Sequence, residues 1–447
     1  SLEPTKPFPF LDSKILCGNS LLGTTPYLLG KGIPDEAFQA LEGDDKKWVA
    51  QLKKRNQGER IGKSQGQLFE DVPQAPEFGA VTHELETLDD SSLPALRAIA
   101  ARYRRFRESP QLLREQLAAD AWCAAFVVEK RPDLPVITQE VMRSLRAGEN
   151  VLTPAGELVE KTAEDYKFLH WYLAFPGIFT GRAGEAPGWK GGFDVVLGNP
   201  PWERLKIQEK EWFATRSAEV AEASNAAARG KKIEELKTTN PRLFGEFSAD
   251  LRRSEGESAF LHQSGRYPLC GRGDINTYAV FSETNLMLLA PSGRAGFIVP
   301  PGIATDHTTQ HYFSSLIKHG QLASLYTFEN EERLFPGIDH RVNFTLLTLT
   351  GRDSPITHAH FVWFARRVEH VYDEERRFSL SPDDFLRLNP NTLTCPIFRS
   401  KHDAEINLQI YRRIHVLWRE GPPEENPWGL KFQRMFDMAT DSGLFRT

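Results

Sequence analysis

The feature that most constrains the fold is a short apolar run that leads directly into two consecutive prolines. The run is Phe193-Asp194-Val195-Val196-Leu197, and Gly198-Asn199-Pro200-Pro201-Trp202 follows it. A short, apolar, β-branched run of this kind is typical of a strand buried in an α/β sheet. Proline has a fixed φ angle and no N–H group, so two prolines end the strand and hold the next turn rigid. We therefore expect a buried strand that delivers Asn199 to Trp202 beyond its carboxyl end.

Strand and helix patterns alternate around this run, and the alternation predicts an α/β fold. The remaining strand candidates are residues 14–23, which run into a Gly/Asn turn, and residues 295–299, 322–326 and 342–349. Helical patterns lie at residues 277–289 and 307–319, and long helical stretches occupy residues 35–150 and 203–262. Ser91 and Ser92, with Pro94 just after them, predict the start of one of these helices. The fold class that we expect is an α/β, partial Rossmann-like sheet with large helical insertions.

Composition excludes several other classes of protein. The four cysteines lie far apart, which argues against a zinc ribbon or a disulfide framework and suits a reducing cytoplasm. No apolar run approaches the roughly 20 residues of a membrane span, so no membrane partner is expected. The formal net charge of −5 is not that of a simple basic nucleic-acid binder. Any nucleic-acid site would therefore confine its positive charge to one cleft.

The tetrapeptide Asn-Pro-Pro-Trp has a definite chemical interpretation. In open α/β sheets, ligands bind beyond the carboxyl ends of the strands, which is where Asn199 is expected. The Asn199 side-chain oxygen and the Pro200 carbonyl together suit both protons of an exocyclic amine, and Pro201 keeps the turn rigid. Trp202 offers a flat face to a base, and such stacking is worth roughly 1–3 kcal/mol. A base within a duplex has to be flipped out to reach this loop. The plainer alternative is a rigid turn that closes a strand.

With these residues in place, the sequence resembles the gamma-class N6-adenine DNA methyltransferases. It most closely resembles the large enzymes of type IIG restriction-modification systems and of DISARM and BREX phage-defence systems. The resemblance extends to residues 15–23, 273–281, 296–301, 340–344 and 436–445. It implies S-adenosylmethionine as cofactor, double-stranded DNA with a flipped adenine as partner, and methyl transfer to adenine N6. Partner subunits of a defence system are a further expectation.

The resemblance also implies roles for single residues. The catalytic target-base loop would be Asn199, Pro200, Pro201 and Trp202, with Phe344 on the other face of the flipped base. Gly18 and Asn19 match the segment that approaches the adenine of the cofactor. No metal ion is expected, and no residue needs to form a covalent bond to the substrate.

One departure from the family pattern concerns the cofactor. The family's glycine-rich loop, of the Asp-Pro-Ala-Cys-Gly-Ser-Gly type, does not appear before residue 15. We therefore expect an internal fragment of a longer protein that binds S-adenosylmethionine poorly and is inactive alone. The expected segments are core 1–30, helical insertion 31–165, core strand and target-base loop 166–205, helical insertion 206–270, remaining core 271–352, and 353–447 leading to a missing recognition domain.

Two other functions stay open, and three motifs are set aside. The same tetrapeptide serves methylation of RNA and of protein amides, and the chain would otherwise be a non-catalytic remnant or scaffold subunit of a defence complex.

Residues 58–64 are one residue short of a phosphate-binding loop. His307 and His311 have no evident third metal ligand nearby. The basic run at residues 102–107 suits a solvated helix face better than a phosphate site.

Overall fold

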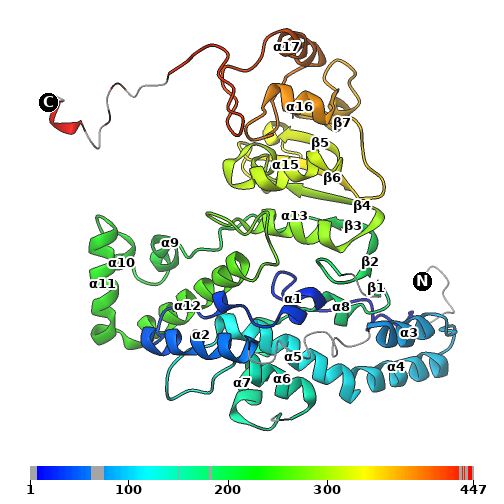
Figure 1. The fold of residues 1–447 in the computed structure, drawn as a ribbon, viewed down its shortest axis with the longest axis vertical. Helices are drawn as coiled ribbons and strands as arrows, with labels where there is room; N and C mark the ends of the chain where they lie inside the picture. The colour runs from blue at the N-terminus through cyan, green and yellow to red at the C-terminus, as the bar shows by residue number, and fades with distance from the viewer. Residues whose placement is uncertain are drawn as a thin grey trace. The chain divides into compact units, whose positions relative to one another are not determined.

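The computed structural model describes residues 8–61, 75–149, 151–180, 184–431, 435, 437 and 441–444. The chain separates into two compact units. Unit 1 comprises Ser1–Val299 and Leu349–Ser354, and unit 2 comprises Pro300–Thr348 and Pro355–Thr447. Both contain helices and strands (Figure 1), so the expected mixed α/β class is confirmed.

Unit 1 contains a helical part built around one long buried helix. Helix α5 (Pro110–Val127) is buried on nearly all sides over its second half. Helices α6 (Gln139–Ala147), α7 (Pro154–Tyr166) and α12 (Pro241–Gln263) pack against it. A helix that is apolar all round is stable only in such a setting. Its Trp122 ring meets the rings of Phe126 and Phe260 with centroids 5.2 and 6.0 Å away.

The other helices of unit 1 are shorter or lie nearer to solvent. They are α1 (Pro26–Lys31), α2 (Lys46–Ile61), α3 (Ala75–Glu86), α4 (Leu93–Arg107), α8 (Trp171–Ala174), α9 (Glu209–Ala214), α10 (Ala218–Ala221) and α11 (Ala226–Thr239). The predicted start of α4 is confirmed, since the Ser92 side chain accepts a hydrogen bond from the Ala95 N–H at 3.3 Å. Phe213 and Phe247 join α9 and α12 in a separate small core.

The strands of unit 1 carry the run that ends in the two prolines. They are β1 (Phe179–Thr180), β2 (Lys190–Gly191), β3 (Phe193–Gly198) and β4 (Leu289–Val299), with helix α13 (Thr277–Leu288) just before β4. β3 pairs with β4 in parallel, so that Leu197 lies opposite Gly296 and Gly198 opposite Phe297. The predicted strands at residues 193–197 and 295–299 and the predicted helix at residues 277–289 are therefore confirmed.

Two expectations about unit 1 are wrong. Strand β3 is an edge strand and is not buried, because Val195 and Leu197 expose 62% and 79% of their surface. An apolar run does not distinguish a central strand from an edge strand, since both have the same local pattern. Residues 14–23 form no strand either; one isolated bridge joins Asn19 to Phe168. Contacts from distant residues, set out below, hold this segment in an irregular conformation.

Unit 2 contains four neighbouring strands, in the order β6-β5-β7-β8, of a six-stranded sheet. Its elements are α14 (Gly302–Thr305), α15 (Gln310–Lys318), β5 (Leu322–Glu329), β6 (Asn343–Thr350), β7 (Ala359–Ala365), β8 (Phe378–Leu380), α16 (Pro382–Leu388) and α17 (Lys401–Arg413). β5 and β7 are parallel, whereas β7 and β8 are antiparallel. The predicted strands at β5 and β6 are confirmed. β7 and β8 were not predicted, because the charged and proline-containing sequence after Gly351 masks their short apolar runs.

Some expectations fall outside the described residues. They include residues 62–64 of the near phosphate-binding loop and half of residues 436–445. Over the ranges that the structure does describe, no helix is both long enough and apolar enough to cross a membrane.

Candidate functional site

The Asn-Pro-Pro-Trp loop is fixed to two neighbouring elements of unit 1. The Trp202 indole N–H donates to the Ile298 carbonyl on β4 over 3.3 Å. The Thr277 hydroxyl, at the first residue of α13, lies 2.8 Å from the Pro201 carbonyl. Pro200, just before these two anchored residues, is buried. The loop is therefore held at its end by the adjacent strand and near its middle by the start of a helix.

The chain just after the loop pairs with the residues that precede α13. The Glu203 N–H donates to the Thr277 hydroxyl over 3.2 Å, and the Thr277 N–H donates to the Glu203 carbonyl over 3.0 Å. With its amide nitrogen facing the loop, Asn276 donates to the carbonyls of Glu203 and Trp202 over 2.9 and 3.3 Å. Sequence reasoning missed both anchoring residues. Their only local signal is that Asn-Thr before an apolar run is typical of a helix start.

Two acceptors in the loop have no hydrogen-bond partner in the described part of the chain. Asn199 is exposed, and no residue in the described part of the chain bonds to its side chain or to the Pro200 carbonyl. Trp202 is half-buried, and none of the described rings stacks on it. The loop thus presents two fixed acceptors and an aromatic face, which together suit a flat ligand that carries an amino group.

The predicted cofactor segment is rigid for a different reason. The Asn19 N–H donates to the Lys167 carbonyl over 2.6 Å, and the Asn19 side-chain oxygen accepts from the Leu21 N–H at 3.1 Å. The Tyr267 hydroxyl donates to the Leu21 carbonyl over 2.7 Å, and buried Arg266 donates to the Gly23 carbonyl. The side-chain nitrogen of Asn19 has no partner among the described residues. It is a donor held in a fixed place.

A buried histidine completes the support of this segment. The Thr24 N–H donates to His170 Nδ1 over 3.0 Å, so the ring proton lies on Nε2, 2.9 Å from the Asp120 carboxylate. The side-chain nitrogen of Gln116 donates to the same carboxylate at 3.2 Å. His170, in the segment before α8, and Asp120, on α5, therefore position the segment from Gly18 to Thr24.

Phe344 belongs to unit 2 and is buried there. Its ring is parallel to that of Phe328, with centroids 5.0 Å apart, and the ring of Phe335 meets it edge-on at 4.9 Å. Stacking of a base on Phe344 would therefore require one of these two rings to move. Phe335 is 39% exposed and lies in the loop between β5 and β6, so it is the easier of the two to displace.

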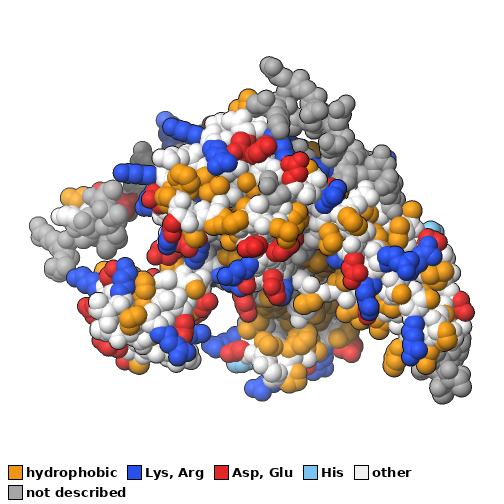
Figure 2. All heavy atoms as spheres, turned by 90° about the horizontal axis from the view of Figure 1, so that it is seen from below, with side chains coloured by type: hydrophobic (Ala, Val, Ile, Leu, Met, Phe, Trp, Pro, Cys, Tyr) orange, Lys and Arg blue, Asp and Glu red, His pale blue; other side chains and the backbone are white. Residues whose placement is uncertain are grey.

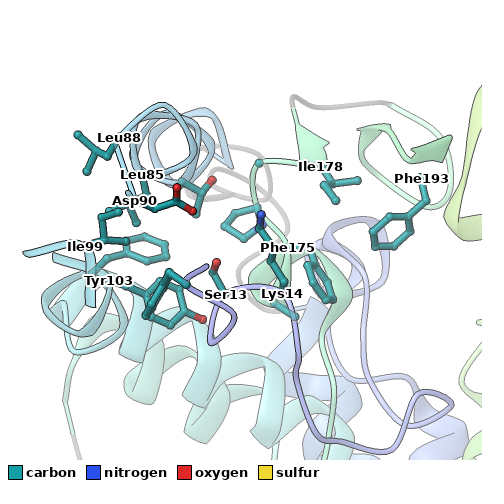
Figure 3. Close-up of a pocket in the computed structure, with 16 residues that line it drawn as sticks. Ser13, Lys14, Leu85, Leu88, Asp90, Ile99, Tyr103, Phe175, Ile178 and Phe193 are labelled. Atoms are coloured by element: carbon teal, nitrogen blue, oxygen red, sulfur yellow. The ribbon is translucent and has the colours of Figure 1, made fainter. Parts of the chain in front are cut away.

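A cavity of about 340 Å³ lies at the other end of β3. Figure 3 shows its lining, which includes Phe193, Phe175, Tyr103 and Lys14. Phe193 is the first residue of β3 and the loop follows the last, so roughly 17 Å of strand separates the cavity from the loop. This cavity is not part of the candidate site.

Metal ligands do not gather near any of these residues. Within the described ranges, no group of three or more His, Cys, Asp or Glu residues is placed to hold a metal ion. His307 and His311 are both exposed.

Comparison with known proteins adds a family match to this geometry. Residues 142–264 match the family model described as Eco57I restriction-modification methylase, and this stretch contains the whole Asn-Pro-Pro-Trp loop. The match supports a methyltransferase of the restriction-modification type for this region. No curated protein matches the chain.

Several solved structures resemble the chain weakly. The type I restriction-modification methyltransferase subunit from Streptococcus thermophilus is 12% identical, with 71% of this chain and 68% of that chain covered and a TM-score of 0.26. The type ISP restriction-modification enzyme LlaBIII bound to DNA is 11% identical (78% and 26% covered, TM-score 0.22). A putative class I S-adenosylmethionine-dependent methyltransferase from Listeria monocytogenes is 10% identical (74% and 92% covered, TM-score 0.20). Similarity this low assigns no activity.

Proposed function

We propose that this chain carries the target-base half of an enzyme that transfers a methyl group from S-adenosylmethionine to adenine N6 in DNA. The enzyme would serve a restriction-modification or phage-defence system. The observation that carries the proposal is the pair of acceptors without partners at Asn199 and Pro200, on a loop that is fixed to Thr277 and to the Ile298 carbonyl. The loop lies inside the stretch that matches a restriction-modification methylase.

The proposed chemistry needs positioning rather than covalent catalysis. The Asn199 side-chain oxygen and the Pro200 carbonyl accept the two protons of the adenine amine, which raises the electron density on its nitrogen. Trp202 stacks on the base and sets the plane in which the nitrogen lone pair points. Because the acceptors are fixed before the base arrives, little entropy is lost in orienting the reacting atoms, which is a large source of rate enhancement. S-adenosylmethionine, when bound, supplies the electrophilic methyl group.

Asn19 fits the adenine end of this cofactor. Its side-chain oxygen is already bonded to the Leu21 N–H, so the contribution of Asn19 to a ligand is a donor, Nδ2. Such a donor suits a ring nitrogen of adenine rather than its amine. Gly18 lets this segment pass close to Leu169, whose Cβ would lie 3.0 Å from a Cβ atom at position 18. Since these two residues reach only one end of the cofactor, we expect the isolated chain to bind it weakly.

The test is transfer of labelled methyl groups from S-adenosylmethionine to plasmid DNA. It compares this chain, the full polypeptide that its gene encodes, and the Asn199→Ala variant of each. We expect transfer by the full polypeptide and a loss of roughly 100-fold or more in the variant, because an amine held by one acceptor is poorly aimed. Asn199→Asp keeps an acceptor and should retain part of the activity.

The control is Asn407→Ala, because within the described residues that side chain bonds only inside α17, to the Asp403 carbonyl at 2.8 Å. Methyl transfer to RNA or to a protein amide, with DNA unmodified, would replace the proposed substrate. A full polypeptide that binds no S-adenosylmethionine would indicate a non-catalytic subunit instead.

A further inference from the structure

We propose that a polar groove beside the target-base loop binds the phosphodiester backbone of the DNA strand that flanks the flipped base. This inference rests on the proposed function and assigns the DNA contact to a definite place in unit 1. The groove holds about 910 Å³. Its walls are the chain that follows the loop, helix α12, the segment at residues 39–41, and the turn before α13.

The groove is tied directly to the loop. The Ser254 hydroxyl on α12 donates to the Leu205 carbonyl over 2.8 Å, and the Ile207 N–H lies 3.3 Å from the same hydroxyl. Lys206, which lines the groove, is four residues from Trp202, so their Cα atoms are at most about 14 Å apart. That distance corresponds to roughly four nucleotides along one strand. A base on the loop therefore brings its neighbouring phosphates within reach of the groove.

The carboxylates along the groove are all engaged. Glu209 lies 3.2 Å from the Arg229 guanidinium, and Asp274 lies 3.8 Å from that of Arg204. The third, Glu255, accepts from the backbone N–H of Glu42 at 2.8 Å. The charges of Glu209 and Asp274 are thus offset by guanidinium groups, whereas the charge of Glu255 has no cationic partner among the described residues.

Two lysines of the groove remain without such partners. Lys206 and Lys210 are exposed, and neither side chain pairs with any residue in the described part of the chain. Both follow the loop closely in sequence and both line the groove. An anion that enters the groove therefore meets two ammonium groups and one carboxylate, Glu255, without ionic partners. The balance is positive and suits successive phosphates of one strand.

A DNA contact on this chain has to be a local site, because the surface as a whole is not basic. Basic, acidic and apolar side chains are interspersed on the face that Figure 2 shows, and the formal net charge is −5. The main competing surface is the outer side of α4, where Arg104 and Arg105 are exposed. It lies on a helix whose other arginines partly pair within the protein, as Arg102 does with Glu84. Among the described residues, no hydrogen bond or ion pair joins α4 to the loop, so the groove is the better candidate.

The experiment titrates a short fluorescent DNA duplex of mixed sequence by anisotropy over a range of salt concentrations. The variants are Lys206→Gln with Lys210→Gln, the matched pair Lys53→Gln with Lys54→Gln on α2, and the competing pair Arg104→Gln with Arg105→Gln. Each lost phosphate contact should lower the slope of log affinity against log salt by about 0.9. We expect the groove pair to lower it by about 2 and to weaken binding roughly tenfold or more at low salt.

The α2 pair should leave the slope unchanged. A wild-type salt slope in the groove variant would overturn the proposal that the groove binds DNA. The same holds if the slope falls by about 2 in the α4 variant instead. Either result leaves the proposed function intact. Asn199→Ala separates the two claims, because it should abolish methyl transfer and keep the salt slope. If the wild-type chain binds no DNA at any salt concentration, both claims are overturned.

Discussion

One hydroxyl holds the target-base loop in place at the residue scale. Thr277 contacts the Pro201 carbonyl and also the backbone of Glu203. Thr277→Val keeps the shape of the side chain and leaves these backbone groups without their partner, which costs about 1 kcal/mol. We expect methyl transfer to fall roughly tenfold, because the acceptors become less well aimed. The measurement is single-turnover methyl transfer by the full polypeptide.

Thr238→Val is the matched control, since that hydroxyl bonds only to the Glu235 carbonyl on exposed α11. Equal losses in the two variants would show that the Thr277 hydroxyl has no special role in the loop.

A buried carboxyl group makes stability depend on pH. Glu283, on α13, accepts from the N–H groups of Leu269 and Cys270 at 3.1 and 2.7 Å. Burial raises its pKa from 4.5 to about 7 despite these bonds. Between those two values the folded state keeps a proton that the unfolded state has released, so stability falls as pH rises through this window. A pKa shift of this size changes the free energy of unfolding by roughly 3 kcal/mol at most.

We therefore expect Glu283→Gln to remove this dependence. Urea unfolding of both proteins at about pH 5 and about pH 8 would test it, with the wild type losing more stability than the variant. Parallel losses in the two proteins would mean that Glu283 titrates normally.

The residues of the site could be found from the sequence only where their pattern is local. Asn199 to Trp202 stand out because two prolines follow an apolar run. Thr277 does not stand out, because nothing in its own neighbourhood shows that it will meet Pro201, which lies 76 positions earlier in the chain. The partners of Asn19 are equally distant in sequence, and so an irregular segment was predicted as a strand.

Packing of residues 18–24, the predicted cofactor segment, is the main constraint at the element scale. A Cβ atom on Gly23 would lie 2.0 Å from the Leu169 carbonyl oxygen, so the backbone would have to move. Gly58 is an exposed residue of α2, and a Cβ atom there would meet nothing within 4 Å. We expect Gly23→Ala to destabilise the protein by more than about 2 kcal/mol. Gly58→Ala should stabilise it by roughly 0.5–1 kcal/mol, because alanine favours helix.

Urea unfolding of the two variants beside the wild type would measure both effects. A neutral Gly23→Ala change would show that residues 18–24 pack loosely, and would weaken their assignment to a fixed cofactor contact.

Element types were predicted better than element environments. The apolar runs at β3, β5 and β6 and the start of α13 were all located from the sequence, since each has a clear period and a clear end. The exposure of β3 was not, because burial depends on what lies beside a strand and not on the strand itself. β8 was missed because three residues carry too little periodicity to recognise.

At the scale of the whole molecule, helices on both sides of β3 support the site within unit 1. Helix α5, before β3, supplies Asp120 behind residues 18–24, and helix α13, after β3, supplies Thr277 beside the loop. The positive charge that DNA requires is confined to places such as the groove, because the chain as a whole is acidic. A methyltransferase of the restriction-modification type is consistent with both features.

The central claim is that the loop methylates adenine at N6 through Asn199. The most direct test is to modify DNA with the full polypeptide, digest it to nucleosides and identify the methylated species by mass spectrometry and chromatography. We predict N6-methyladenine as the only new nucleoside, and its absence from DNA treated with the Asn199→Ala variant. A methylated cytosine, or N6-methyladenine formed equally well by the variant, would contradict the claim.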